Sequence, residues 1–171
     1  MARQLWLLRH ADAEPHGMRP DHHRELTVRG KHQAHVAGLA IKRMDVEFEA
    51  LLSSPKARAR ETAELAGAHW SGAQRGLLET HPPLAGGFGF ADARAALELL
   101  SADGRVLLVG HEPDFSSVVA DFTGARIDLK KGALAVVRLD SSAAGELIAL
   151  LRPRELALIA ADLSTEAIGS S

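Results

Sequence analysis

Short apolar runs alternate along the chain with longer segments in which apolar residues recur every three or four positions. The short runs are typical of buried strands, and the longer periods are typical of helices packed on a sheet. We expect six strands, over residues 3–9, 47–53, 76–79, 104–110, 133–140 and 146–152. The alternation of strands with helices predicts an α/β fold with a mainly parallel sheet.

Local signals predict where the helices begin. Thr27 is a typical N-cap, and Val28 starts the apolar face of the helix that follows it. Ser54 followed by Pro55 predicts the start of a second helix, because a capping residue before a proline at the first helical position favours one. Three further helices are expected, over residues 90–100 and 115–122 and in a short segment after residue 153.

The composition narrows the class of protein. A chain of 171 residues is long enough for one domain over residues 1–171, with a frayed C-terminus expected from about residue 162. The net charge of -2 argues against a nucleic-acid binder, and no apolar stretch has the length of a membrane span. The first apolar run is too short for a signal peptide, and the chain has no cysteine. We therefore expect a cytoplasmic protein with no nucleic-acid or membrane partner.

Polar side chains follow three of the predicted strands. Arg9 and His10 end the first strand, and His111 follows the strand over residues 104–110. Arg58 lies early in the helix after the second strand, and its side chain is expected to lean back toward the start of that helix. Ligands bind outside the carboxyl ends of strands in an open parallel sheet, so we expect these four residues to meet at one edge.

The charge of this cluster indicates its ligand. Two arginines and two histidines beside the N-termini of two helices concentrate positive charge in a nearly neutral protein. Guanidinium groups and free helical N–H groups bind phosphate well, so a phosphoryl group is the best candidate. No GxxxxGK[ST] loop is present, which excludes a P-loop nucleotide site. Arginines beside His10 and His111 would repel a cation, so we expect neither a metal nor another cofactor.

Several segments that carry these residues resemble the histidine phosphatase superfamily (branch 1). "LLRHADAE" is similar to its Arg-His signature. "RELTVRG", "SSPKARARETA", "VGHEPDFS" and "LKKGALAVVRL" are similar to motifs of the SixA-type phosphohistidine phosphatases, and they occur in the order of that family. The resemblance implies a phosphoglycerate mutase-like fold, a three-layer α/β/α sandwich.

The resemblance also implies roles for individual residues. His10 would be the nucleophile and become transiently phosphorylated, while Arg9, Arg58 and His111 would bind the phosphoryl group. Glu79 is the positional candidate for the general acid. A nucleophilic imidazole must be neutral and correctly oriented, which usually means that its other nitrogen donates to a carbonyl.

The sequence leaves the substrate open. A short chain leaves little room for a lid that encloses a small molecule, which favours phosphohistidine on a protein, such as a histidine-containing phosphotransfer domain. The alternative is a small phosphate ester, with the His-rich loop from Ala11 to Glu25 supplying specificity. A silent phosphate-binding module is disfavoured because His10 is retained. Glu61 stands where many relatives have Gln, and we expect it near Arg58.

Overall fold

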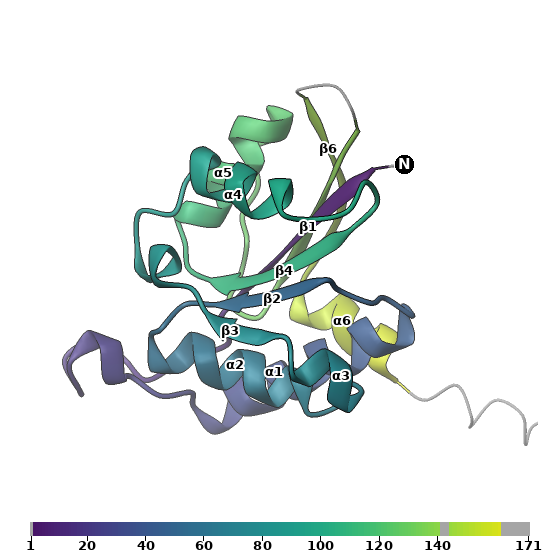
Figure 1. The fold of residues 1–171 in the computed structure, drawn as a ribbon. Coiled ribbons are helices and arrows are strands. Elements are labelled where there is room, and N and C mark those ends of the chain that lie inside the picture. Colours follow the sequence, from purple (N-terminus) through teal and green to yellow (C-terminus); the bar gives the residue numbers. More distant parts are fainter. Residues whose placement is uncertain (1, 141–143, 162–171) are drawn as a thin grey trace, which may run out of the picture.

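The structure is a computed structural model that describes residues 2–140 and 144–161 (Figure 1). The expected frayed end from about residue 162 lies outside these residues. The strands are β1 (Arg3–Arg9), β2 (Ala50–Ser53), β3 (Leu78–Thr80), β4 (Arg105–Gly110), β5 (Leu134–Leu139) and β6 (Gly145–Leu151). The helices are α1 (Val28–Arg43), α2 (Ala57–Gly67), α3 (Gly72–Arg75), α4 (Phe90–Glu98), α5 (Asp114–Thr123) and α6 (Pro153–Ala160), with 3-10 turns η1 (Asp21–His23) and η2 (Pro82–Ala85).

The strands form one six-stranded sheet in the order β3-β2-β4-β1-β5-β6. The four strands β3, β2, β4 and β1 are parallel to one another. Strand β5 pairs antiparallel with β1, and β6 pairs antiparallel with β5. The expected mainly parallel sheet is confirmed. The carboxyl ends of β1, β2 and β4 therefore lie at the same edge. Ligands bind outside this edge in open α/β sheets, so the residues that follow these three strands are placed where a ligand is expected.

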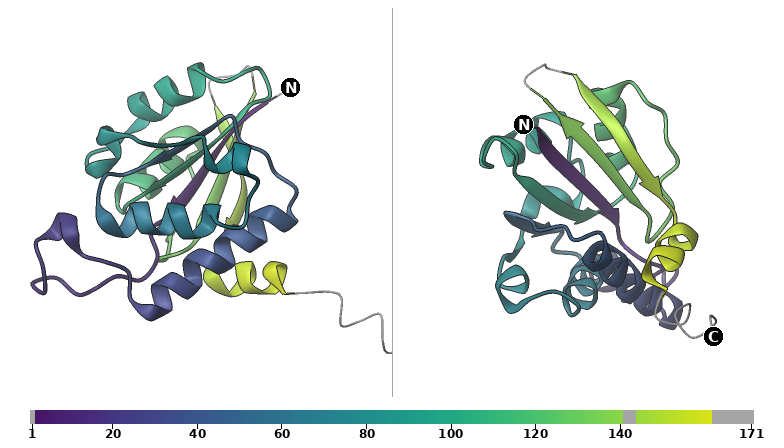
Figure 2. Two further views of the ribbon diagram at one scale, coloured as in Figure 1. Left: turned by 60° about the horizontal axis from the view of Figure 1, so that its bottom comes forward. Right: turned by 90° about the vertical axis from the view of Figure 1, so that its right-hand side faces the viewer.

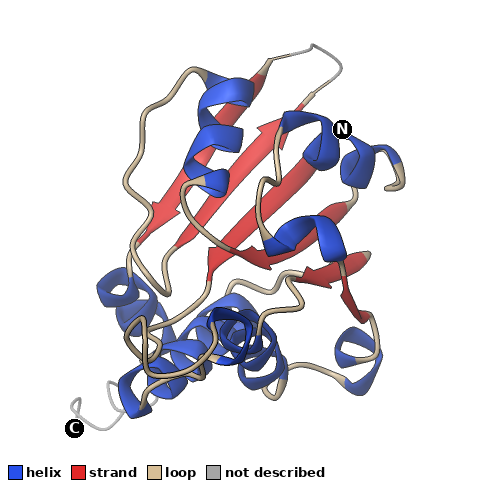
Figure 3. Ribbon diagram, turned by 90° about the vertical axis from the view of Figure 1, so that its left-hand side faces the viewer, coloured by secondary structure: helices blue, strands red, loops and turns tan. Residues whose placement is uncertain are grey.

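Helices cover both faces of this sheet and complete the predicted three-layer sandwich (Figures 1 and 3). The side chains of β1 alternate between the two cores, as the pleat requires. Leu5 and Leu7 pack in the core beneath α4 and α5, whereas Trp6 and Leu8 pack in the core on the side of α1, α2 and α6. Strand β1 is thus fixed from both sides, and its last residues are held rigidly.

The buried face of α1 differs from the apolar pattern that the sequence suggests. Val28 is 87 % exposed, although Thr27 caps the helix as expected and accepts a hydrogen bond from the N–H of Gly30 at 3.0 Å. The buried positions are mainly alanine and glycine. A Cβ on Gly38 would stand 2.2 Å from the carbonyl oxygen of Ala66, so the small residues let α1 approach α2 closely.

Helix α2 begins two residues later than predicted. Its N-cap is Lys56, and Ser54 and Pro55 form a turn before it. The N–H of Ser54 still bonds to the carbonyl of Val109 in β4, so this residue continues the sheet and cannot start a helix. The Ser54 hydroxyl instead accepts a hydrogen bond from the N–H of Lys56. As a result, Arg58 is the second residue of α2, in its first turn.

The segment between β1 and α1 projects from one end of the sheet (Figure 2). It is expected to be a loop, and apart from the turn η1 and one bridge between Ala13 and Leu26 it is irregular. The bridge closes the base of the loop, and η1 lies against α2. No helix in the described part of the chain is both long and apolar enough to cross a membrane.

Candidate active site

The carboxyl ends of β1 and β4 bring the two predicted histidines together. Arg9 is paired with Gly110 in the parallel ladder, and the N–H of His10 donates to the carbonyl of Gly110 at 3.0 Å. His10 and His111 therefore leave neighbouring strands side by side, and their ring centroids are 5.2 Å apart. Both side chains are almost fully buried, as is Arg58, and Arg9 is half-buried.

The orientation of His10 follows from one hydrogen bond. Its Nδ1 lies 2.8 Å from the carbonyl oxygen of Ala11. A carbonyl oxygen only accepts, so Nδ1 carries the proton and Nε2 holds a free lone pair. The hydroxyl of Thr62 in α2 accepts from the N–H of Ala11 at 3.1 Å and donates to the carbonyl of Arg58, which fixes the chain just after the histidine.

The surroundings keep both imidazoles neutral. Burial lowers the pKa of His10 to about 3, and the nearby charges of Arg58 and Arg9 act in the same direction. Burial also lowers the pKa of His111 to about 3, assisted by His10 and Arg58. A neutral His10 with its lone pair on Nε2 has the protonation state that a nucleophile needs.

The two arginines are anchored through one end of each guanidinium. Nη1 of Arg9 donates to the carbonyl of Leu129 at 2.9 Å, and Nη1 of Arg58 donates to the carbonyl of Asp21 at 2.8 Å. Three buried side-chain nitrogens within the described residues have no hydrogen-bond partner: Nε of Arg9, Nε of Arg58 and Nδ1 of His111. All three belong to the predicted set, and the two guanidinium nitrogens can only donate. This set of donors suits an anion.

His111 is held in place by the turn before α2. Its Nε2 lies 2.8 Å from the hydroxyl oxygen of Ser54, the same oxygen that accepts from the N–H of Lys56. The sequence places Ser54 after a strand but gives no sign of this contact, because the partner lies 57 residues away in the chain. Ser54 therefore positions His111 through its side chain.

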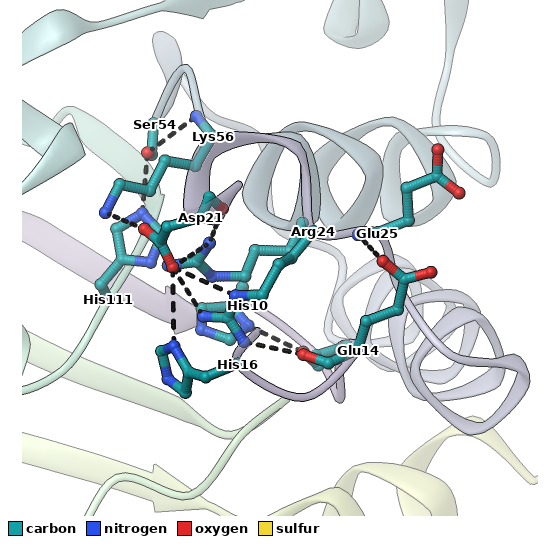
Figure 4. Close-up of polar contacts among 11 residues, drawn as sticks. His10, Glu14, His16, Asp21, Arg24, Glu25, Ser54, Lys56 and His111 are labelled. Atoms are coloured by element: carbon teal, nitrogen blue, oxygen red, sulfur yellow. Dashed lines mark hydrogen bonds and ion pairs between the residues drawn. The ribbon is translucent and has the colours of Figure 1, made fainter. Parts of the chain in front are cut away.

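The loop after β1 contributes a further charged group to the site (Figure 4). The carboxylate of Asp21 lies 2.9 Å from Nζ of Lys56, 2.9 Å from a guanidinium nitrogen of Arg24 and 3.4 Å from Nη1 of Arg58. Hydrogen bonding to Lys56, then to Arg24, holds the pKa of Asp21 well below its usual range. The pattern of apolar positions gave no signal for this cluster, since its contacts come from an irregular loop.

The sequence singles out two glutamates, Glu61 as a neighbour of Arg58 and Glu79 as the candidate general acid. Glu61 does not pair with Arg58; its carboxylate accepts from the N–H of Leu26 at 2.9 Å and lies 3.3 Å from Nζ of Lys31. Glu61 lies three residues after Arg58 in α2, as the sequence requires, but its carboxylate binds the end of the loop and not the guanidinium of Arg58. Glu79 is exposed on β3, in register with Leu52 of β2, and that short strand ends at the same edge as the site.

Comparison with known proteins agrees with this geometry. The family model of the histidine phosphatase superfamily (branch 1) matches residues 5–82. An uncharacterized protein of Picosynechococcus sp. is 27 % identical over 163 residues, which cover 90 % of this chain and 98 % of that protein. The segment that the family model matches contains Arg9, His10 and Arg58.

Solved structures extend the likeness over nearly the whole fold. The protein histidine phosphatase SixA in complex with tungstate superimposes with a TM-score of 0.77 and 28 % identity, covering 90 % of this chain and 99 % of that one. A candidate phosphohistidine phosphatase SixA from Nakamurella multipartitia has the same fold, with a TM-score of 0.73 and 24 % identity over 90 % of this chain and 97 % of that one. The chain therefore resembles the histidine phosphatase superfamily (branch 1) over residues 5–82 and the SixA structure over 90 % of its length, and these likenesses support a phosphatase.

Proposed function

We propose that this protein removes the phosphoryl group from phosphohistidine on a protein substrate, through an intermediate phosphorylated on His10. The observation that carries the proposal is the state of His10: a neutral, buried imidazole with its lone pair on Nε2, beside two guanidinium groups. Arg9, Arg58 and His111 bind the oxygens of the phosphoryl group. The unpartnered Nε atoms of Arg9 and Arg58 donate to those oxygens, and Nδ1 of His111 donates in the tautomer whose Nε2 accepts from the Ser54 hydroxyl.

The reaction has two steps that return the enzyme to its starting state. Nε2 of His10 attacks the phosphorus, the P–N bond to the substrate imidazole breaks, and the substrate nitrogen keeps the bonding electrons. Water then attacks the phosphorus of phosphorylated His10, and its oxygen leaves with the phosphate while Nε2 recovers the lone pair. The guanidinium groups of Arg9 and Arg58 stabilise the charge on the phosphoryl oxygens in both steps, which is the main demand of phosphoryl transfer.

Phosphohistidine makes a smaller demand on a general acid than an ester does. An alcohol must gain a proton as it leaves, whereas an imidazole already protonated on its other nitrogen leaves as a neutral base. Transfer between two imidazoles also exchanges one P–N bond for another of the same kind. Glu79, which is exposed on β3, then acts as an acid only toward esters.

The test compares two kinds of substrate on matched variants. The wild type should hydrolyse a phosphorylated histidine-containing phosphotransfer domain with a higher kcat/KM than a small phosphate ester such as p-nitrophenyl phosphate. His10→Ala should abolish both activities, and His32→Ala, at an exposed histidine of α1, should retain both. Addition of EDTA should change neither rate. Full activity of His10→Ala would refute the mechanism, and a higher kcat/KM for the ester would refute the substrate class.

A further inference from the structure

A groove of about 520 Å³ lies beside the active site, and six of its lining residues are cationic. They are Arg9, Arg29, Lys130, Lys131, Arg152 and Arg154. Building on the proposed function, we propose that this basic groove docks an acidic segment that flanks the phosphohistidine of the protein substrate. The groove would thus select substrates by the charge around the phosphorylated residue.

Besides Arg9 at the end of β1, the groove gathers its cations from three other parts of the fold. Arg29 lies in the first turn of α1, Lys130 and Lys131 lie in the turn before β5, and Arg152 and Arg154 lie where β6 passes into α6. Such a concentration is unusual in a chain whose net charge is -2. It produces a local positive potential that attracts an acidic partner.

Neighbouring carboxylates neutralise only part of this charge. Lys131 lies 3.5 Å from Asp12, which itself lines the groove, and Lys130 lies 2.6 Å from Asp128. Arg152 pairs with Glu155 of α6. These three pairs leave the other three cations of the groove in excess.

Two of the excess cations are free to meet a partner. Arg29 and Arg154 are exposed, and neither forms an ion pair with any residue between 2 and 140 or between 144 and 161. An exposed cation without a counter-charge can bind a carboxylate at no cost in free energy for breaking an existing ion pair. Arg29 and Arg154 are therefore the residues at which substrate charge should be sensed.

The groove shares Arg9 with the proposed phosphoryl site. This residue lines the groove and also directly precedes His10. A chain whose phosphohistidine meets His10 therefore has its flanking residues within reach of the groove. No separate binding event is required, because the same partner occupies both places.

The lining suits an acidic protein segment better than a small molecule. Pockets for small molecules carry only a few placed polar groups, whereas six of the nine residues that line this groove are cationic, and their aliphatic stems supply much of its surface. Long, exposed cations pair weakly and adaptably with carboxylates, and they mainly raise association rates and set partner choice. Several acidic side chains on one segment can engage such a surface together.

Matched peptides test this proposal. One phosphohistidine peptide carries four glutamates beside the phosphorylated residue and the other carries four glutamines. At low salt the wild type should hydrolyse the glutamate peptide with a kcat/KM about tenfold higher, and high salt should remove the difference. Arg29→Glu combined with Arg154→Glu should abolish the preference while the glutamine peptide is hydrolysed at the wild-type rate. Arg94→Glu, on α4 at the other face of the sheet, is the control and should keep the preference.

A second readout separates this proposal from the choice of phosphohistidine as substrate. The unphosphorylated glutamate peptide should inhibit hydrolysis of p-nitrophenyl phosphate more strongly than the glutamine peptide, even if neither phosphopeptide is hydrolysed. Equal inhibition by the two peptides, or a preference that survives both charge reversals, would overturn the docking proposal. A higher kcat/KM for a small bisphosphate than for a monophosphate, with equal kcat/KM for the two peptides, would also overturn it. The groove would then bind a small molecule.

Discussion

The depressed pKa values of the two active-site histidines make the stability of the protein depend on pH in a predictable way. In the folded protein the pKa of His10 and of His111 is about 3, because both side chains are buried. In the unfolded chain a histidine has a pKa near 6.5. Between these two values the unfolded chain binds protons that the folded protein does not bind. The free energy of unfolding must therefore fall as the pH falls below about 6.5.

The magnitude follows from the two pKa values. Between pH 7 and pH 5 the unfolded chain becomes almost fully protonated at both histidines, while the folded protein stays neutral at both. Each histidine then lowers the free energy of unfolding by about 2 kcal/mol, and the pair lowers it by about 4 kcal/mol. The carboxylates with lowered pKa, such as Asp21, lose their contribution mainly at still lower pH, because they stay ionised in both states at pH 5.

The assay is urea unfolding at pH 7 and pH 5, for the wild type and for His10→Gln. Glutamine cannot titrate, so the variant should lose about 2 kcal/mol less than the wild type over this interval. Any contribution from other groups cancels in this comparison, since both proteins share them. An equal loss in both proteins would mean that His10 titrates alike in the folded and unfolded states. The claim of a neutral, buried nucleophile would then be wrong.

Three other substitutions test the site and the packing beneath it. Glu79→Gln should slow hydrolysis of alkyl phosphates about 100-fold and leave phosphohistidine hydrolysis nearly unchanged; equal rates for the ester would exclude Glu79 as the acid. Asp21→Asn removes a counter-charge from Lys56 and Arg58, so inorganic phosphate should inhibit about fivefold more strongly, and weaker inhibition would contradict the reasoning. Gly38→Ala should cost about 3 kcal/mol of stability in urea unfolding because of the 2.2 Å clash with Ala66, and a stable variant would disprove this close contact.

Much of the site could be predicted from the sequence because its residues stand at the ends of apolar strands. The runs before Arg9 and before His111 are short and continuously apolar, which marks buried parallel strands. Strands of that kind end at a common edge, so residues far apart in sequence could be placed together. The structure shows His10 and His111 in contact there, and the charge of Arg58 acts on both of them.

The remaining parts of the site depend on contacts that leave no periodic signal. Asp21 reaches Lys56 and Arg58 from an irregular loop, and the bond from His111 to Ser54 joins two turns. The sequence pattern predicts the start of α2 two residues too early for a similar reason, since a hydrogen bond to β4 holds Ser54 in the sheet and overrides its capping preference. In each case a tertiary contact decides the local structure.

Rapid quenching with a radiolabelled phosphohistidine protein tests whether His10 carries the phosphoryl group during turnover. The wild type should trap label on the enzyme in a form that acid removes and base preserves, and peptide mapping should place that label on His10. His10→Ala should trap none. Label on another residue, or hydrolysis at the normal rate with no labelled enzyme at any time, would contradict the mechanism.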